Sequence, residues 1–131
     1  MAGLEYRGTL TGTVPTPARD LPCNATYWET AKPNDAVIIN ASGEVAKAPI
    51  TGPAAGVLAA KEFIMEKEAP IVKVRFDKNA LYEAKVTGGT PVLFAEYELT
   101  ATGEVNVAGT TNKAVKVQQI LPEGTVKVTL L

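Results

Sequence analysis

The sequence of 131 residues contains no histidine. Histidine is the side chain that most often acts as a general base near neutral pH and as a metal ligand. A Ser-His-Asp or Cys-His catalytic group therefore cannot form, and a zinc site would have to rely on Cys23 and carboxylates. We expect no catalytic residues, no bound metal and no cofactor, and we expect that the protein is not an enzyme.

Cysteine is scarce as well, because Cys23 is the only one. One cysteine excludes an internal disulfide framework of the kind that small secreted domains need. A chain of this length can bury a hydrophobic core without such cross-links. We expect Cys23 to be a small buried apolar group rather than a nucleophile.

Neither charge nor hydrophobicity is concentrated in one part of the chain. Thirteen basic and fourteen acidic residues give a net charge of −1, and Lys and Arg do not cluster as a phosphate backbone would require. No apolar run approaches the roughly 20 residues of a membrane span, and the N-terminal MAGLEYRG lacks the apolar segment of a signal peptide. We therefore expect no nucleic acid and no membrane as partners, and synthesis in a cytoplasm.

Paired carboxylates are the one catalytic possibility that the composition leaves open. Glu62, Glu66 and Glu68, or else Glu96 and Glu98, could supply an acid and a base. The segment that carries the second pair also has the alternation of a half-buried strand with one wet face. We favour that structural interpretation. Neither a GxxxxGK[ST] nor a GxGxxG phosphate-binding sequence is present.

Residues 1–33 differ from the rest of the chain. They contain four prolines and show no sustained periodicity, and proline excludes a helix interior or a central strand. We predict an extended N-terminal arm, with short strands at 4–8 and 24–29. A disordered tail is the alternative, but such tails are poor in aromatic residues. The apolar and aromatic residues that argue for an arm docked on a partner are Tyr6, Leu21, Tyr27 and Trp28.

Residues 34–131 have the pattern of a β-rich globular domain. Short segments rich in β-branched residues alternate with turn sequences such as Ser42-Gly43, Gly88-Gly89 and Glu123-Gly124. This spacing predicts an all-β fold, either a small β-sandwich or a β-barrel. Residues 58–66 have helix-forming composition, but we favour a strand that starts at Gly56. The other predicted strands are 37–39, 71–76, 91–94, 114–117 and 125–131.

The sequence also contains an internal similarity. The segment 42-SGEV-45 recurs sixty positions later as 102-TGEV-105. This predicts an internal two-fold repeat whose halves pack face to face around one core, and chance similarity of β-hairpins is the alternative. Two copies are too few for a solenoid. The further matches are Ala55 and Val57 with Val115 and Val117, 72-VKV-74 with 126-VKV-128, and 35-DAVI-38 with 90-TPVL-93.

Most of residues 34–131 resembles a known family. The runs 34-NDAVIINASGEVAKAP-49, 80-ALYEAKVTGGTPVLFAEYELTATGEVNVAGTTNKAVKVQQI-120 and 124-GTVKVTLL-131 resemble the head decoration proteins of tailed bacteriophages, also called structural cement proteins. The resemblance is one of pattern: a strand, a Gly turn with TGEV, a Thr/Asn-rich loop and a valine-rich closing strand. No catalytic motif accompanies it.

The resemblance implies a compact β domain that binds the outer surface of an expanded phage head and stabilises it by bridging capsid subunits. It implies the major capsid protein as partner, a homotrimer on the capsid, and a location on the virion. Such proteins use an extended terminal arm, which here would be residues 1–33. Tyr6, Leu21, Tyr27 and Trp28 are then the candidate residues of the capsid interface, because buried aromatic side chains dominate interface energetics.

A second function class stays open. A carbohydrate- or surface-binding β module of a phage tail or cell-surface protein would have a similar composition. It would need an exposed groove lined by aromatic side chains, whereas several of the aromatic residues lie in the arm. A carboxylate-dependent hydrolase built on Glu96 and Glu98 is a third possibility, and no other feature of the sequence favours it.

Overall fold

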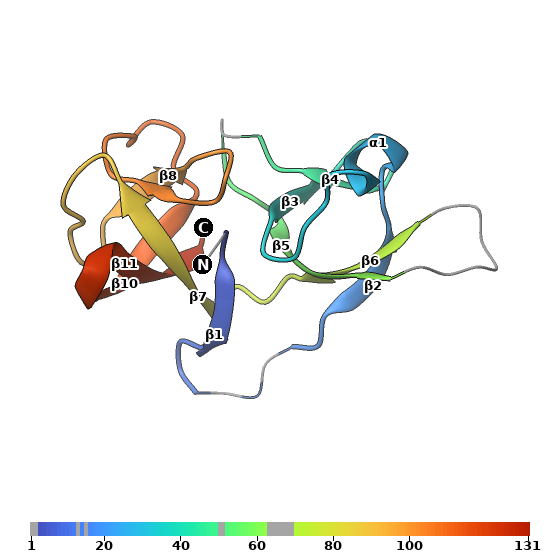
Figure 1. Cartoon of the computed structure of the whole chain (residues 1–131). Coiled ribbons are helices and arrows are strands. Elements are labelled where there is room, and N and C mark those ends of the chain that lie inside the picture. Colours follow the sequence, from blue (N-terminus) through green and yellow to red (C-terminus); the bar gives the residue numbers. More distant parts are fainter. Residues whose placement is uncertain (1–2, 13, 15, 50–51, 63–69) are drawn as a thin grey trace.

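The computed structural model describes residues 3–12, 14, 16–49, 52–62 and 70–131. This part of the chain is almost entirely β structure, which confirms the predicted all-β class (Figure 1). The strands are β1 (Glu5–Thr9), β2 (Arg19–Pro22), β3 (Ala36–Ile39), β4 (Val45–Lys47), β5 (Gly56–Glu62), β6 (Ile71–Arg75), β7 (Ala80–Thr87), β8 (Glu96–Leu99), β9 (Val105–Asn106), β10 (Val115–Leu121) and β11 (Thr125–Leu130). A single helical turn, α1 (Ala25–Trp28), and a 3-10 turn, η1 (Pro122–Gly124), accompany them.

The molecule consists of two units that lie side by side (Figure 1). The first unit contains β2 to β6 with α1, and the second contains β7 to β11. In the second unit the strand order is β7-β11-β10-β8-β9, and β9 pairs in parallel with β7. This last pairing closes the sheet into a five-stranded barrel. Closure removes the unpaired edges that an open sheet would expose.

The first unit has the same strand order. Its sheet runs β2-β6-β5-β3-β4, and an isolated parallel bridge between Cys23 and Val45 joins the two outer strands. The corresponding contact of the second unit is the parallel pair of Val86 with Val105. The two units therefore share both their topology and the place at which the sheet returns on itself.

The equivalence extends to single residues in the hairpins. Ile39 lies opposite Val45 in the first unit, and Leu99 lies opposite Val105 in the second. Both members of the second pair follow those of the first by sixty positions. The predicted similarity of the two TGEV-like segments is therefore confirmed as a repeat of structure.

The turns between these hairpin strands are also the same. The amide of Gly43 donates to the carbonyl of Asn40 at 3.0 Å, and the amide of Gly103 donates to that of Thr100 at 3.0 Å. The two glycines have φ of 77° and 80°, a region that glycine adopts at little cost. Both units thus use one turn type, and it requires glycine at the same position.

Bulges occur at matching positions in both units. The pairing of β5 with β6 shifts register between Leu58 and Ala60, and the pairing of β10 with β11 shifts between Val117 and Gln119. A bulge inserts one unpaired residue and bends the strand, so it helps a short sheet to curve. This register aligns Leu58 with Val117, whereas the sequence predicted that Val57 aligns with Val117.

Two other details of the predicted repeat are wrong. The counterpart of β3 is β8, not 90-TPVL-93, because the predicted strand 91–94 is a turn that leads into β8. The buried residues also form two cores rather than one, although Ala54 and Val57 of the first unit belong to the second core. The first core contains Cys23, Tyr27, Ala31, Val37, Val45, Leu58, Val72 and Val74. The second contains Leu4, Ala54, Val57, Ala80, Tyr82, Ala84, Tyr97, Leu99, Val105, Ala114, Val115, Val117, Val126, Val128 and Leu130.

The predicted strand at 24–29 is wrong as well, because α1 occupies it. The Asn24 side chain accepts hydrogen bonds from the amides of Thr26 and Tyr27, at 3.1 and 3.0 Å, and this N-cap stabilises the turn. The preference for a strand starting at Gly56 is confirmed up to Glu62. The remainder of the helix candidate lies outside the described residues.

The described residues of 1–33 do not form an arm separate from the globular fold, which corrects the predicted boundary at residue 33. β1 pairs with β7, and β2 pairs with β6. Leu4 and Cys23 are 0% and 1% exposed, within the second and first cores respectively. Proline did not prevent this, because Pro22 ends β2 rather than interrupting a central strand. Residues 10–12, 14 and 16–18, between the two strands, lie outside the sheets, as does α1.

β1 also joins the two units. The amide of Leu4 donates to the carbonyl of Asn34 at 3.0 Å. The Tyr6 ring lies edge-on to Tyr82 with centroids 6.2 Å apart, and the guanidinium of Arg75 lies 3.8 Å from the Tyr6 centroid. Aromatic pairs and cation–π contacts each contribute about 0.5–1 kcal/mol. The N-terminal strand thus packs against side chains of both units.

Reactivity of the Cys23 thiol tests whether the N-terminal segment is folded in. Burial raises the pKa of this thiol, so the nucleophilic thiolate is both rare and covered. We expect alkylation at about pH 8 to be at least tenfold slower in the native protein than in denaturant. Mass spectrometry of the alkylated fraction over time measures this. Equal rates in the two conditions would indicate that residues 19–33 are a detached arm.

Candidate interaction surfaces

Two exposed apolar segments of the described structure are candidates for partner binding. The first is the apolar loop, which we define as Val92, Leu93 and Phe94; these side chains are 60%, 45% and 59% exposed. The second is the β1–β2 connection, which we define by its described residues 10–12, 14 and 16–18; Leu10 and Val14 are exposed there. Large exposed apolar side chains that occur together commonly mark an interaction site.

The apolar loop is held in place by backbone hydrogen bonds. The amide of Phe94 donates to the carbonyl of Val117 at 2.8 Å, and the amide of Ala95 donates to Val92 at 3.2 Å. The amide of Val92 donates to the buried Tyr97 hydroxyl at 3.0 Å. The loop is therefore preorganised, which lowers the entropy lost when a partner binds.

Phe94 has a backbone conformation that is unfavourable for its residue type. Its φ is 66°, in the left-handed region, where a bulky residue is an outlier. The equivalent position of the first unit is Asn34, with φ of 79°, and Asn tolerates this region well. Phe94 thus places an exposed aromatic ring at a position where stability alone would favour Asn or Gly.

The β1–β2 connection is anchored at both ends. The amide of Leu10 donates to the carbonyl of Asn79 at 2.7 Å, and the amide of Thr16 donates to the Asp77 carboxylate at 3.0 Å. The amides of Thr16 and Asn79 lower the pKa of the Asp77 carboxyl by hydrogen bonding to its charged form. Between these anchors the connection carries the 92% exposed side chain of Val14.

Two of the residues predicted for the capsid interface are committed to internal contacts. Tyr27 is 7% exposed, and its hydroxyl donates to the Asp35 carboxylate at 2.7 Å. Burial, and then this hydrogen bond, raise the pKa of the hydroxyl, so it stays protonated and donates. Tyr6 is half-buried between Tyr82 and Arg75. Tyr27 therefore belongs to the first core, while its role at a capsid interface stays a prediction.

The other two predicted interface residues, Leu21 and Trp28, are partly buried against the first core. The Lys61 ammonium lies 4.5 Å from the Trp28 ring centroid and donates to the Trp28 carbonyl at 2.7 Å. These contacts account for the apolar side chains of Leu21 and Trp28 without a partner. The structure does not bring the four predicted residues together on one surface.

The carboxylates have structural partners where the structure describes them. Glu98 accepts hydrogen bonds from the amides of Thr111 and Asn112, at 3.2 and 2.9 Å, and so fixes the loop after β9. Glu96 lies 3.9 Å from the Lys113 ammonium. The burial of strand 96–99 alternates as the structural interpretation predicted. Glu66 and Glu68 lie outside the described residues, and so does the side chain of Glu62.

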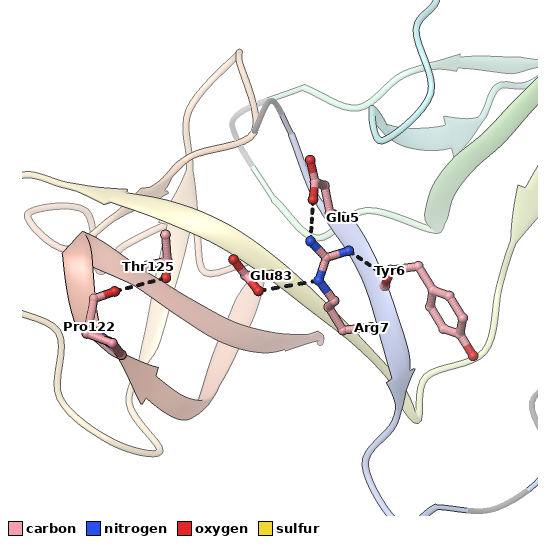
Figure 2. Close-up of polar contacts among 6 residues, drawn as sticks. All are labelled: Glu5, Tyr6, Arg7, Glu83, Pro122 and Thr125. Carbon is pink, nitrogen blue, oxygen red and sulfur yellow. Dashed lines mark hydrogen bonds and ion pairs between the residues drawn. The ribbon is translucent and has the colours of Figure 1, made fainter.

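β1 is also held on β7 by charged side chains. Figure 2 shows Arg7 bridging Glu5 on its own strand, at 2.6 Å, and Glu83 on β7, at 3.3 Å. Tyr6 points to the other side of β1, as strand alternation requires. Arg7 is 42% exposed, and exposed ion pairs contribute little to stability. The bridge helps to set the register of β1 more than it stabilises the fold.

A groove of about 540 Å³ lies between the two units. Six of the nine residues that line it are polar or charged, and a Lys47–Asp35 ion pair of 3.3 Å lies along it. None of the described residues that line it is aromatic. The residues are Gly3, Glu29, Thr30, Lys32, Pro33, Asp35, Lys47, Ala101 and Thr102.

Comparisons with known proteins do not name a family. No family model matches the chain, and no curated protein or solved structure shows significant similarity to it. In the described part of the chain, no helix has the length and apolar character needed to cross a membrane.

Sequence reasoning missed the apolar loop because it interpreted 91–94 as a strand. One signal was present: Val92, Leu93 and Phe94 are three consecutive large apolar residues, whereas a half-buried strand alternates. The following segment 96–99 does alternate, and it is the strand. The run 92–94 does not alternate, and it lies between Gly88-Gly89 and the alternating strand 96–99. These features together indicated an exposed turn.

Replacing Phe94 by Asn tests whether the loop is kept at a cost in stability. The repeat itself supplies this residue at the equivalent position, so Phe94→Asn is expected to raise the free energy of unfolding by about 1 kcal/mol. Chemical denaturation measures the change. The matched variant Val92→Asn alters exposure without relieving the positive φ and should not stabilise the protein. Destabilisation by Phe94→Asn would show that the ring is needed for folding.

Proposed function

We propose that the protein is a capsid decoration protein, which binds the outer surface of an expanded phage head and stabilises it by bridging capsid subunits. The observation that carries the proposal is the β1–β2 connection, an exposed apolar segment anchored at both ends to a compact β scaffold. The resemblance of residues 34–131 to head decoration proteins supplies the choice of partner, the major capsid protein. It also supplies the homotrimer and the location on the virion.

We assign this role to other residues of 1–33 than those predicted from the sequence. Tyr27 is a core residue, and Leu21 and Trp28 pack against the first core. Among the described residues of 1–33, the β1–β2 connection carries the exposed large apolar side chains. Leu10 and Val14 replace the earlier candidates as its apolar contact residues, being 44% and 92% exposed.

The mechanism is mass action. A protein that binds the expanded lattice, and not its dissociated subunits, stabilises the lattice by RT ln(1 + [L]/Kd) for each occupied site. Contacts with more than one capsid subunit add effective concentration to the affinity of each contact. No bond is made or broken, so the role requires a stable scaffold and exposed contact residues rather than a catalytic centre.

Co-sedimentation with phage heads tests this function. We expect saturable binding of the purified protein to emptied, expanded heads of the source phage and no binding to unexpanded proheads. Absence of binding to both particles would contradict the proposal. A glycan array would then test the carbohydrate-binding alternative, which lacks an aromatic lining in the groove between the units.

Variants of the β1–β2 connection test the assigned contact. The double variant Leu10→Ser/Val14→Ser should weaken head binding at least tenfold, since truncated interface anchors commonly cost more than 1 kcal/mol. Ile120→Ser is the matched control, because Ile120 is 47% exposed on β10 of the second unit. Equal loss of binding in both variants would show that general surface hydrophobicity, and not this segment, mediates the contact.

A further inference from the structure

The two units contact each other through different surfaces. The first unit contributes its loop face, which we define as the loop before β3 and the described residues of the β4–β5 connection, 48–49 and 52–55. The second unit contributes its turn face, the turn between β8 and β9. A small cavity between them is lined by Asp35, Ala36, Lys47, Ala48, Pro49, Gly52 and Ala54 on one side and by Leu99, Thr100, Ala101 and Gly103 on the other.

The contact is close enough to depend on small residues. A Cβ on Gly103 would lie 2.7 Å from the Gly3 Cα, and a Cβ on Gly3 would lie 2.6 Å from the Asn34 carbonyl oxygen. Gly3 therefore lies between the loop face of the first unit and the turn face of the second. The amide of the next residue, Leu4, donates to the same carbonyl of Asn34.

This arrangement is head-to-tail, not two-fold symmetric. Gly43 is the equivalent of Gly103, and no described atom lies within 4 Å of a Cβ built on it. The turn face of the first unit is therefore uncovered. The loop face of the second unit is uncovered too, because it carries the exposed apolar loop with Phe94 at the position of Asn34. A head-to-tail contact leaves one unmatched surface at each end.

The two uncovered faces carry exposed apolar side chains at positions equivalent to those of the contact within the chain. Ile39 on the first turn face is 40% exposed, while its equivalent Leu99 is 7% exposed against the first unit. On the second loop face Val92 and Phe94 are 60% and 59% exposed. Ile39 thus lacks the kind of cover that Leu99 receives inside the chain.

We propose that the apolar loop of one copy docks on the β3–β4 turn of a second copy, and so repeats between chains the contact that joins the two units within a chain. The occupant is a second copy because the two free faces are the repeat equivalents of surfaces that already bind each other. Val92, Leu93 and Phe94 contact Ile39 and the Gly43 turn of the neighbour. This contact accounts for the presence of a bulky residue at position 94, where the backbone conformation is unfavourable for it.

The charges around the two faces suit a contact between separately folded copies. The Lys116 ammonium lies 5.9 Å from the Phe94 ring centroid, and Glu44 follows Gly43 in the opposing turn. An apolar centre with a polar rim is typical of interfaces between chains. The contact within the chain differs, because the small apolar residues Ala36 and Ala48 pack there against the second core.

Complementation between two variants tests the proposal without phage heads. Phe94→Asp damages only the loop face, and Ile39→Asp damages only the turn face. We expect the wild type to self-associate with increasing concentration in sedimentation velocity runs, and each variant alone to remain monomeric. An equimolar mixture of the two variants should form dimers, because each retains one intact face. Val14→Asp, outside both faces, should associate like the wild type.

Several outcomes would overturn the proposal. They are a monomeric wild type at all concentrations, undiminished association of either variant, and a mixture that stays monomeric although both variants are folded by circular dichroism. Phe94→Asn replaces Phe94→Asp if the latter does not fold, because Asn suits the backbone of this position. Head binding and self-association are measured separately, so failure of one leaves the other result interpretable.

Discussion

The structure depends on the return of each five-stranded sheet onto its own first strand. In the first unit this return is the parallel contact of Cys23 with Val45, and in the second it is the pairing of Val86 with Val105. A sheet of so few short strands buries its core only when it curves and closes, since an open sheet of this size would leave one face and two edges in water. The N-terminal residues that complete the first unit are therefore part of the fold. The matching bulges, which bend β5 and β10, serve the same closure.

The proposed contacts use the surfaces that the two units do not bury against each other. Two equivalent units joined head to tail hide one loop face and one turn face, and they leave the other pair exposed. The second unit departs from the first where its side chains are free, with Phe94 in place of Asn34. The β1–β2 connection has no equivalent between β6 and β7, because only four residues separate Arg75 from Ala80. The proposed contact between copies and the proposed contact with a capsid thus fall on different surfaces, so variants can alter one and keep the other.

The sequence predicted the parts of this structure that depend on local pattern. Alternation identified β6, β8 and β11, and the two TGEV-like turns identified the repeat because a glycine with positive φ is needed in both. It did not predict the place of residues 1–33, because strand pairing over long distances leaves no local signal and proline suggested an arm. The aromatic residues of that segment predicted contacts with a partner. Tyr27 in fact fills a core, and nothing local distinguishes a buried tyrosine from an interface one.

Native-state hydrogen exchange tests the duplicated, closed architecture most directly. The amides of Cys23 and Asn24 donate to the carbonyls of Pro70 and Val45, and the amide of Val107 donates to Thr87 at the matching site of the second unit. If both sheets return on themselves, all three amides should exchange orders of magnitude more slowly than unprotected amides, with similar protection in the two units. Protection of Val107 together with unprotected Cys23 and Asn24 would contradict the account, because the first unit would then lack the N-terminal strand that completes it.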